Sequence, residues 1–195
     1  MPEHVPDQAH EQVLRVAGCL FRERGYTAVT MRDITDALNI RQASLYSHTI
    51  EGKEQLFVEV TQQQLIHHRR ELDHIIEEAE PTIATQLRAI ASWLLSQPPL
   101  DFTRFFRSEL TALSETHRYQ LADLAHWAWL TPIEQVISAS YERGEIRLVD
   151  RRMMAISFIA VIESVHDMHR YISIPNDPTT NYPVQEPGRR SARRC

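Results

Sequence analysis

Four side chains near residue 42 are of the types that recognise nucleic acid. Arg41, Gln42, Ala43 and Ser44 stand at the start of a short predicted helix, 42–48. A helix in the major groove of DNA presents its N-terminal side chains to the base edges. There, Gln42 can pair with adenine, Arg41 can reach guanine or a phosphate, and Ala43 can touch a thymine methyl. The pattern indicates DNA recognition; the alternative is a solvated polar face on a small helical bundle.

Histidine and glutamate residues form a second pattern, which could imitate a metal site. They recur at helical spacing in one predicted helix and again near the end of the chain: His67, Glu71, His74 and Glu78, then Glu163, His166 and His169. Di-metal sites in helical bundles take ligands from four converging helices, and only two supply them here. We therefore expect solvated or ordinary polar contacts, no metal and no cofactor, with a metal-dependent bundle enzyme as the alternative.

The five glycines argue against the commonest enzyme motifs. No two are spaced for a dinucleotide-binding loop, and the phosphate-binding loop pattern fails at Ser47 and Glu54. The metalloprotease and serine-hydrolase motifs are also missing from the sequence. We predict that the protein is not an enzyme.

Composition describes an ordinary globular chain. The 195 residues carry 21 basic and 26 acidic side chains, a net charge of −5, and 43% are hydrophobic. No apolar run approaches the ~20 residues that span a bilayer, and the N-terminus does not read as a secretory signal. Two cysteines indicate no disulfide framework and fit a reducing compartment. We expect a cytoplasmic protein with no membrane partner.

The spacing of prolines and apolar residues predicts an all-α protein. Helices are expected over 7–24, 30–38 and 42–48, three short elements in a helix-turn-helix pattern. Gly25 suits the position after the first helix. Thr30 and Asp33 form a capping pattern for the second, and Asn39 tolerates the positive φ of the turn that follows it.

Longer helices are expected after Gly52, at 53–80, 82–96 and 151–172, together with a Phe-rich segment over 101–113. Another, 117–143, is expected to kink at Pro132. From Pro175 the chain is predicted to be a flexible tail. The predicted domains are 1–52 for helix-turn-helix DNA binding, 53–174 for effector binding and dimerisation, and 175–195 for the tail.

Residues 13–56 resemble the DNA-binding domain of the TetR family of bacterial transcriptional regulators. The resemblance rests on Phe-Arg-Glu-Arg-Gly-Tyr at 21–26, Thr-x-Arg-x-Ile at 30–34, Leu-Tyr-x-His at 45–48 and Lys-Glu-x-Leu at 53–56. Gly-Glu-Ile-Arg at 144–147 also resembles the family. The family pattern implies a homodimeric regulator, most often a repressor, that binds a palindromic operator in double-stranded DNA and is released by a small, apolar effector.

The resemblance and the chemistry of the 42–48 helix together give the predicted DNA-binding residues. Thr30, Arg32, Tyr46, His48 and Lys53 match family positions that contact the sugar-phosphate backbone. The full predicted set is Thr30, Arg32, Arg41, Gln42, Ala43, Ser44, Tyr46, Ser47, His48 and Lys53.

Aromatic residues gather in the middle of the chain, where the family encloses an effector pocket. The predicted lining, with ordinary core packing as the alternative for each member, is Trp93, Phe102, Phe105, Phe106, Glu109, His126, Trp127 and Trp129.

Apolar residues of the last two long helices predict a homodimer. Spacings of four and three along the last helix leave apolar cover on two faces, which indicates packing against a second copy; burial within one chain is the alternative. The predicted interface residues are Ile133, Val136, Ile137, Tyr141, Met154, Phe158, Val161, Val165 and Met168.

Overall fold

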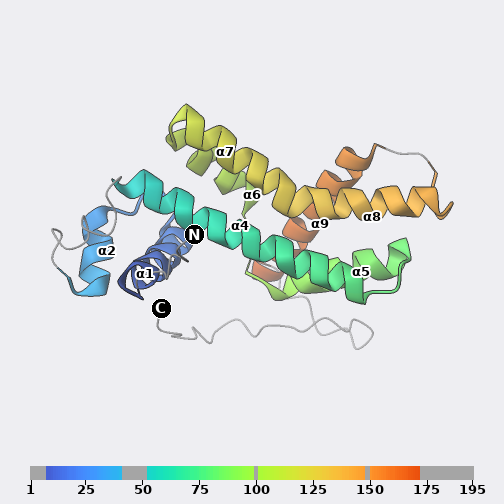
Figure 1. Cartoon of the computed structure of the whole chain (residues 1–195), viewed down its shortest axis with the longest axis horizontal. Helices are drawn as coiled ribbons and strands as arrows, with labels where there is room; N and C mark the ends of the chain where they lie inside the picture. The colour runs from blue at the N-terminus through green and yellow to red at the C-terminus, as the bar shows by residue number, and fades with distance from the viewer. Residues whose placement is uncertain (1–7, 41–51, 99–100, 148–149, 172–195) are drawn as a thin grey trace, which may run out of the picture. The chain divides into compact units, whose positions relative to one another are not determined.

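A computed structural model describes residues 8–40, 52–98, 101–147 and 150–171. Within these ranges the secondary structure is entirely helical, which confirms the all-α prediction. The longer helices are α1 (Gln8–Arg24), α2 (Met31–Leu38), α4 (Gly52–Glu78), α5 (Ile83–Ser96), α7 (Glu115–Ala125), α8 (Thr131–Glu142) and α9 (Arg151–Tyr171) (Figure 1).

The segment between α5 and α7 is a run of short helical turns rather than one helix. It contains α6 (Phe102–Arg104), a π-helical turn (Phe105–Glu109) and a 3₁₀ turn (Leu110–Ala112). A second π-helical turn, His126–Leu130, joins α7 to α8. Pro132, which was expected to kink the 117–143 helix, stands two residues after this π-helical turn, in the first turn of α8.

The chain forms two compact units, and α4 contributes to both. The first comprises the described residues up to His67 together with Phe102–Ala125, and the second comprises His68–Asp101 with the described residues from His126 onward. The predicted boundary between residues 52 and 53 separates two functions rather than two compact units, and it stays a prediction.

In the first unit, α1 packs against α2 and the first half of α4. Val13, Ala17 and Phe21 of α1 are buried together with Ile34 of α2. The ring of Phe21 meets that of Phe57 edge-on at 5.2 Å between centroids. Gly18 permits a close approach to α4, because a Cβ at that position would lie 3.1 Å from Val60 Cγ1.

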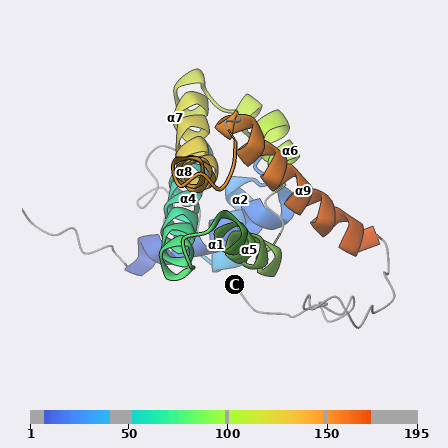
Figure 2. The ribbon, with the colours of Figure 1, turned by 90° about the vertical axis from the view of Figure 1, so that its right-hand side faces the viewer.

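The second unit is built from α5, α8 and α9, with the second half of α4. Figure 2 shows α8 nearly end-on and α9 inclined beside it. The core residues come from one face of each helix and include Leu72, Ile90, Leu94, Ile133, Val136, Ile137, Ala155, Ile159 and Ile162. Burying such aliphatic side chains stabilises a fold by roughly 1.5–3 kcal/mol each.

Candidate nucleic-acid interface

Helix α2 begins in a complete capping box, as the sequence predicted. Thr30 Oγ1 accepts a hydrogen bond from the backbone N–H of Asp33, and Asp33 Oδ2 accepts one of 2.7 Å from the Thr30 N–H. The Thr30 hydroxyl also donates to the same carboxylate. These bonds, those from Thr30 first, lower the pKa of Asp33 below its ordinary value. The cap fixes where α2 starts, at the point where Thr30 was predicted to meet phosphate.

Helix α2 ends in a tight left-handed turn. Asn39 has φ 54° and ψ 42°, and its N–H donates to the carbonyls of Thr35 and Asp36. Ile40 N–H also donates to Thr35 O, at 3.1 Å. The turn confirms the expectation for Asn39 and directs the chain into residues 41–51. The predicted contacts Arg41, Gln42, Ala43, Ser44, Tyr46, Ser47 and His48 lie there, outside the described residues.

Arg32 projects from the exposed side of α2. Its Nε lies 3.7 Å from Asp36 Oδ2, and the two side chains are 85% and 72% exposed. An ion pair so exposed contributes at most about 1 kcal/mol and is screened by salt. A phosphate could compete for this guanidinium at little cost, so Arg32 stays a predicted backbone contact.

Lys53 has a structural role that the sequence did not indicate. Its Nζ donates hydrogen bonds of 3.0 Å to the carbonyl oxygens of both Tyr26 and Val29, and it lies 4.2 Å from the centroid of the Tyr26 ring. Burial lowers the pKa of this ammonium. Lys53 thus fixes the start of α4 to the loop that leads into α2, using two of its three N–H donors; its predicted phosphate contact stays a prediction.

The next residue, Glu54, holds a different element. Its Oε1 accepts a 2.9 Å hydrogen bond from the Ser114 N–H and lies 2.6 Å from His117 Nδ1. The bonds from Ser114 and His117 lower the pKa of the Glu54 carboxyl. Nothing in the sequence pointed to this contact, because residues 54 and 117 are 63 positions apart, and the motif at 53–56 that contains Glu54 does not indicate a partner for its side chain.

Part of the predicted effector region lies in the first unit, around the π-helical turn. Phe102 and Phe106 are stacked with centroids 6.3 Å apart, and Phe105 meets Phe106 edge-on at 5.1 Å. Phe105 is buried, whereas Phe106 is 43% exposed. Glu109 is 7% exposed and forms an ion pair with Arg104 of 3.2 Å, so its carboxylate has a partner within the chain.

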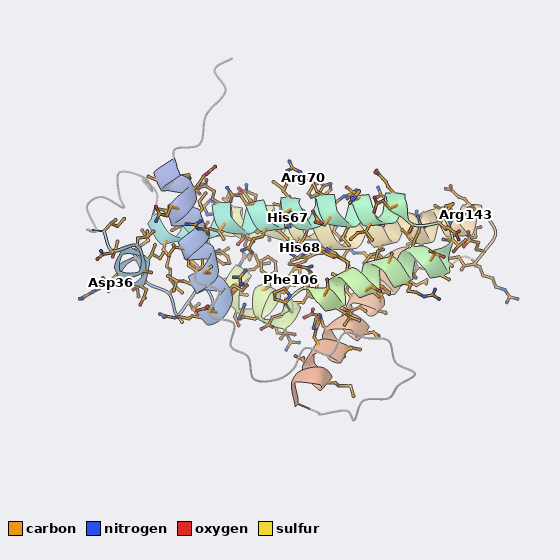
Figure 3. The ribbon with its side chains drawn as sticks, turned by 90° about the horizontal axis from the view of Figure 1, so that it is seen from below. Asp36, His67, His68, Arg70, Phe106 and Arg143 are labelled. Carbon is orange, nitrogen blue, oxygen red and sulfur yellow. The ribbon has the colours of Figure 1, made fainter. Side chains whose placement is uncertain are left out.

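The other predicted effector residues lie in the second unit. Trp93 meets His68 edge-on at 5.3 Å, and His68 lies on α4 beside His67 (Figure 3). Trp127 is 41% exposed, with the Arg69 guanidinium 5.0 Å from its ring centroid, while Trp129 is buried. These tryptophans therefore occupy different surroundings rather than one common wall.

The second unit also carries an open groove of about 770 Å³ along α8 and the start of α9. Among the predicted effector residues, only His126 lines it, and it is paired with Glu134 at 3.3 Å. The other lining residues are polar: Thr131, Gln135, Ser138, Asp150, Arg151 and Arg152. The groove does not match the apolar pocket that we expected.

The predicted dimer residues divide into two groups. Tyr141, Val161 and Met168 are 46%, 61% and 49% exposed, and Met154, Phe158 and Val165 are partly exposed. In contrast, Ile133, Val136 and Ile137 are at most 3% exposed and belong to the core of the second unit. Their assignment to an interface is wrong, because the face of α8 that carries them packs on the chain's own helices.

The histidine pattern resolves into local contacts. His74 lies 3.5 Å from Glu78, and His166 Nε2 lies 3.1 Å from the Leu94 carbonyl. Glu163 accepts a hydrogen bond from the Asp101 N–H. In the part of the chain that the structure describes, no three His, Cys, Asp or Glu side chains are grouped to hold a metal. None of the helices there combines the length and apolar character needed to cross a bilayer.

Comparison with known proteins shows which proteins this chain is similar to. Residues 13–60 match the model of the bacterial regulatory proteins of the tetR family. The chain is 30% identical over 132 residues to the HTH-type transcriptional repressor DhaR of Mycobacterium sp. strain GP1, covering 66% of this chain and 65% of that protein. It is 40% identical over 55 residues to the repressor KstR2 of Mycolicibacterium smegmatis, covering 28% and 26%. The chain thus spans less than two thirds of both curated relatives.

A solved structure shares the fold over most of the chain. The crystal structure of AibR in complex with isovaleryl coenzyme A and operator DNA is 20% identical, with a TM-score of 0.67, and the match covers 82% of this chain and 86% of that one. The chain shares the fold of this solved structure, and its N-terminal residues match bacterial regulatory proteins. More narrowly, residues 13–60 are similar to the TetR family of these proteins.

Proposed function

We propose that this chain is a ligand-responsive, DNA-binding transcriptional regulator and not an enzyme. The observation that carries the proposal is the match over residues 13–60, which includes most of α1, all of α2 and the start of α4. The capping box at Thr30 and the left-handed turn at Asn39 support it, because together they set the direction in which the chain enters residues 41–51. Residues 42–48 form the recognition helix in this proposal.

Repression is the form of regulation that we propose. Both DhaR and KstR2 are named as repressors. In this account Gln42, with its neighbours Arg41, Ala43 and Ser44, reads base edges. Thr30, Arg32, Tyr46, Ser47, His48 and Lys53 position the protein on the phosphates.

The regulator acts as a homodimer on a palindromic operator. A single recognition helix of about two turns offers few base contacts, so specific binding requires two copies related by symmetry. Helix α9 carries exposed apolar residues, including Val161 and Met168. We infer that a second copy of this chain packs against them. Tyr141 of α8 is also exposed, and we assign it to the same interface.

Release by a small, apolar effector completes the proposal. AibR was crystallised with both an acyl thioester of coenzyme A and operator DNA, and it has the same fold. In this chain the stacked rings of Phe102 and Phe106 offer apolar surface to a ligand. An effector shifts the regulator away from DNA only if it binds the released state more tightly. We place the protein in the cytoplasm, where operator DNA lies.

Selection of bound fragments from random and genomic DNA tests the proposal. We expect enrichment of one sequence with two inverted half-sites, together with a strong dependence of affinity on salt. Recovery of fragments without any shared sequence would contradict a specific regulator. A thermal-shift screen with small apolar compounds tests the effector, and isovaleryl coenzyme A, whose coenzyme A part is large and polyanionic, is a separate arm of the screen. A specific DNA-binder that no such compound stabilises or releases would be a regulator without an effector of this class.

A further inference from the structure

The guanidinium of Arg104 joins two parts of the first unit. Its Nε lies 3.2 Å from Glu109 Oε1, and its Nη2 donates a 3.2 Å hydrogen bond to the carbonyl oxygen of Arg22. The Glu109 carboxylate is nearly buried, at 7% residue exposure. A buried carboxylate is costly without a cationic partner, so Glu109 favours a guanidinium at this position.

The carbonyl that Arg104 reaches lies in the last turn of α1. Helix α1 ends at Arg24, and the carbonyls of its last turn have no partner within the helix. A cation at this end is also favoured by the helix dipole. Gly25 follows with φ +81°, and a Cβ there would lie 3.6 Å from Glu109 Oε1 and 3.7 Å from Arg104 Cδ. The ion pair therefore packs directly over Gly25, the residue that follows the end of α1.

The same segment contains a π-helical turn. Leu110 N–H donates to the Phe105 carbonyl, five residues back, which closes a π-helical turn over Phe105–Glu109. A π turn contains an extra residue relative to an α turn. Conversion to α geometry would rotate Glu109 by about 100° relative to Arg104, the angle that one helical residue subtends. The aromatic residues Phe102, Phe105 and Phe106 lie within or next to this turn.

We propose that Arg104 is a positioning residue for DNA binding. Held by Glu109, it fixes the C-terminal end of α1 and thereby the loop from Gly25 into α2. Conversion of the 105–109 turn to α geometry would move Glu109 away from Arg104 and release the C-terminal end of α1. The role in DNA affinity rests on the proposed function, whereas the role in fixing the end of α1 does not.

Three variants test this inference in the full-length protein without any ligand. Arg104→Gln and Glu109→Gln each remove the ion pair, and Arg107→Gln is the matched control, because Arg107 is an exposed arginine on the same turn. The first measurement is hydrogen exchange of the amides from residue 25 to residue 29. The second is the dissociation constant for the selected operator, taken well below each melting temperature.

We expect both ion-pair variants to exchange residues 25–29 at least tenfold faster than wild type, and to bind the operator about tenfold more weakly. The double variant should be no worse than either single one, and Arg107→Gln should behave as wild type in these amides. A purely stabilising ion pair would lower the melting temperature and leave the dissociation constant unchanged, which overturns the proposal. Unchanged exchange overturns it even if no operator is found, whereas failure of wild type to bind DNA contradicts only the proposed function.

Discussion

The ammonium of Lys53 and the backbone carbonyl of Tyr26 are joined by a 3.0 Å hydrogen bond. Lys53 donates equally to Val29, while its neighbour Glu54 accepts from the start of α7. Two consecutive residues at the beginning of α4 therefore hold two different elements of the first unit. The first turn of α4 thus connects the loop that precedes α2 to the beginning of α7.

Replacing Lys53 by methionine tests how much its two hydrogen bonds to Tyr26 and Val29 stabilise the fold. Lys53→Met keeps most of the side-chain volume and removes two charge-assisted hydrogen bonds, so we expect a loss of about 2 kcal/mol in the free energy of unfolding. Urea denaturation measures it. Gln63→Met, at an exposed position of α4, is the control and should change stability little. Equal stability of the two variants would show that the Lys53 bonds contribute nothing net.

The α2 capping box gives a second prediction. Thr30→Ala removes the side-chain acceptor for the Asp33 N–H and should cost about 1 kcal/mol of stability. Thr30→Ser retains the hydroxyl and should stay close to wild type. Thr27→Ala, an exposed threonine in the preceding turn, is the matched control. Urea denaturation again reports the result, and a Thr30→Ala protein as stable as its control would count against the cap.

The contacts of Glu54 predict a dependence of stability on pH. Hydrogen bonds from Ser114 and His117 lower the pKa of this carboxyl in the folded state below its ordinary value of 4.5. The unfolded chain therefore takes up the proton first as pH falls, so the contribution of Glu54 is complete above about pH 4.5 and is lost below it. Between pH 6 and pH 3.5, wild type should lose more stability than Glu54→Gln.

Chemical denaturation at a series of pH values measures this difference. Glu77→Gln, an exposed glutamate of α4, should retain the pH profile of wild type. Parallel profiles for wild type and Glu54→Gln would contradict the assigned role of the Ser114 and His117 contacts.

The corrected dimer surface gives a fourth prediction. Val161 is 61% exposed on α9, so Val161→Asp should leave the fold intact and convert a dimer into a monomer in sedimentation experiments. Ile137 is 1% exposed, so Ile137→Asp should unfold the protein instead, because it buries a charge without a partner. A Val161→Asp protein that remains dimeric would place the interface elsewhere.

Local signals in the sequence predicted the helices well. Gly25, the Thr30–Asp33 capping pair and Asn39 each fix a backbone conformation through their own chemistry, and each stands where the sequence indicated. The two π-helical turns were not predicted, because a one-residue change in helical register leaves the spacing of apolar residues almost unaltered.

Contacts between distant residues were the part that the sequence could not reveal. Apolar spacing shows that Ile133 and Ile137 are covered, but it does not distinguish cover by the same chain from cover by a second copy. Similarly, Arg104 and Lys53 have the residue types of phosphate ligands, and only the packed structure shows the carbonyls to which they donate.

The most direct test of the central claim is the binding of purified protein to its selected operator, followed by fluorescence anisotropy. Gln42→Ala and Tyr46→Phe should each weaken binding, Gln42→Ala by roughly tenfold or more from the loss of a bidentate base contact, while the protein stays dimeric. Gln63→Ala, on the exposed side of α4, should bind as wild type does. If both the Gln42 and Tyr46 variants bind the operator as tightly as wild type, residues 42–48 are not the recognition helix and the account is wrong.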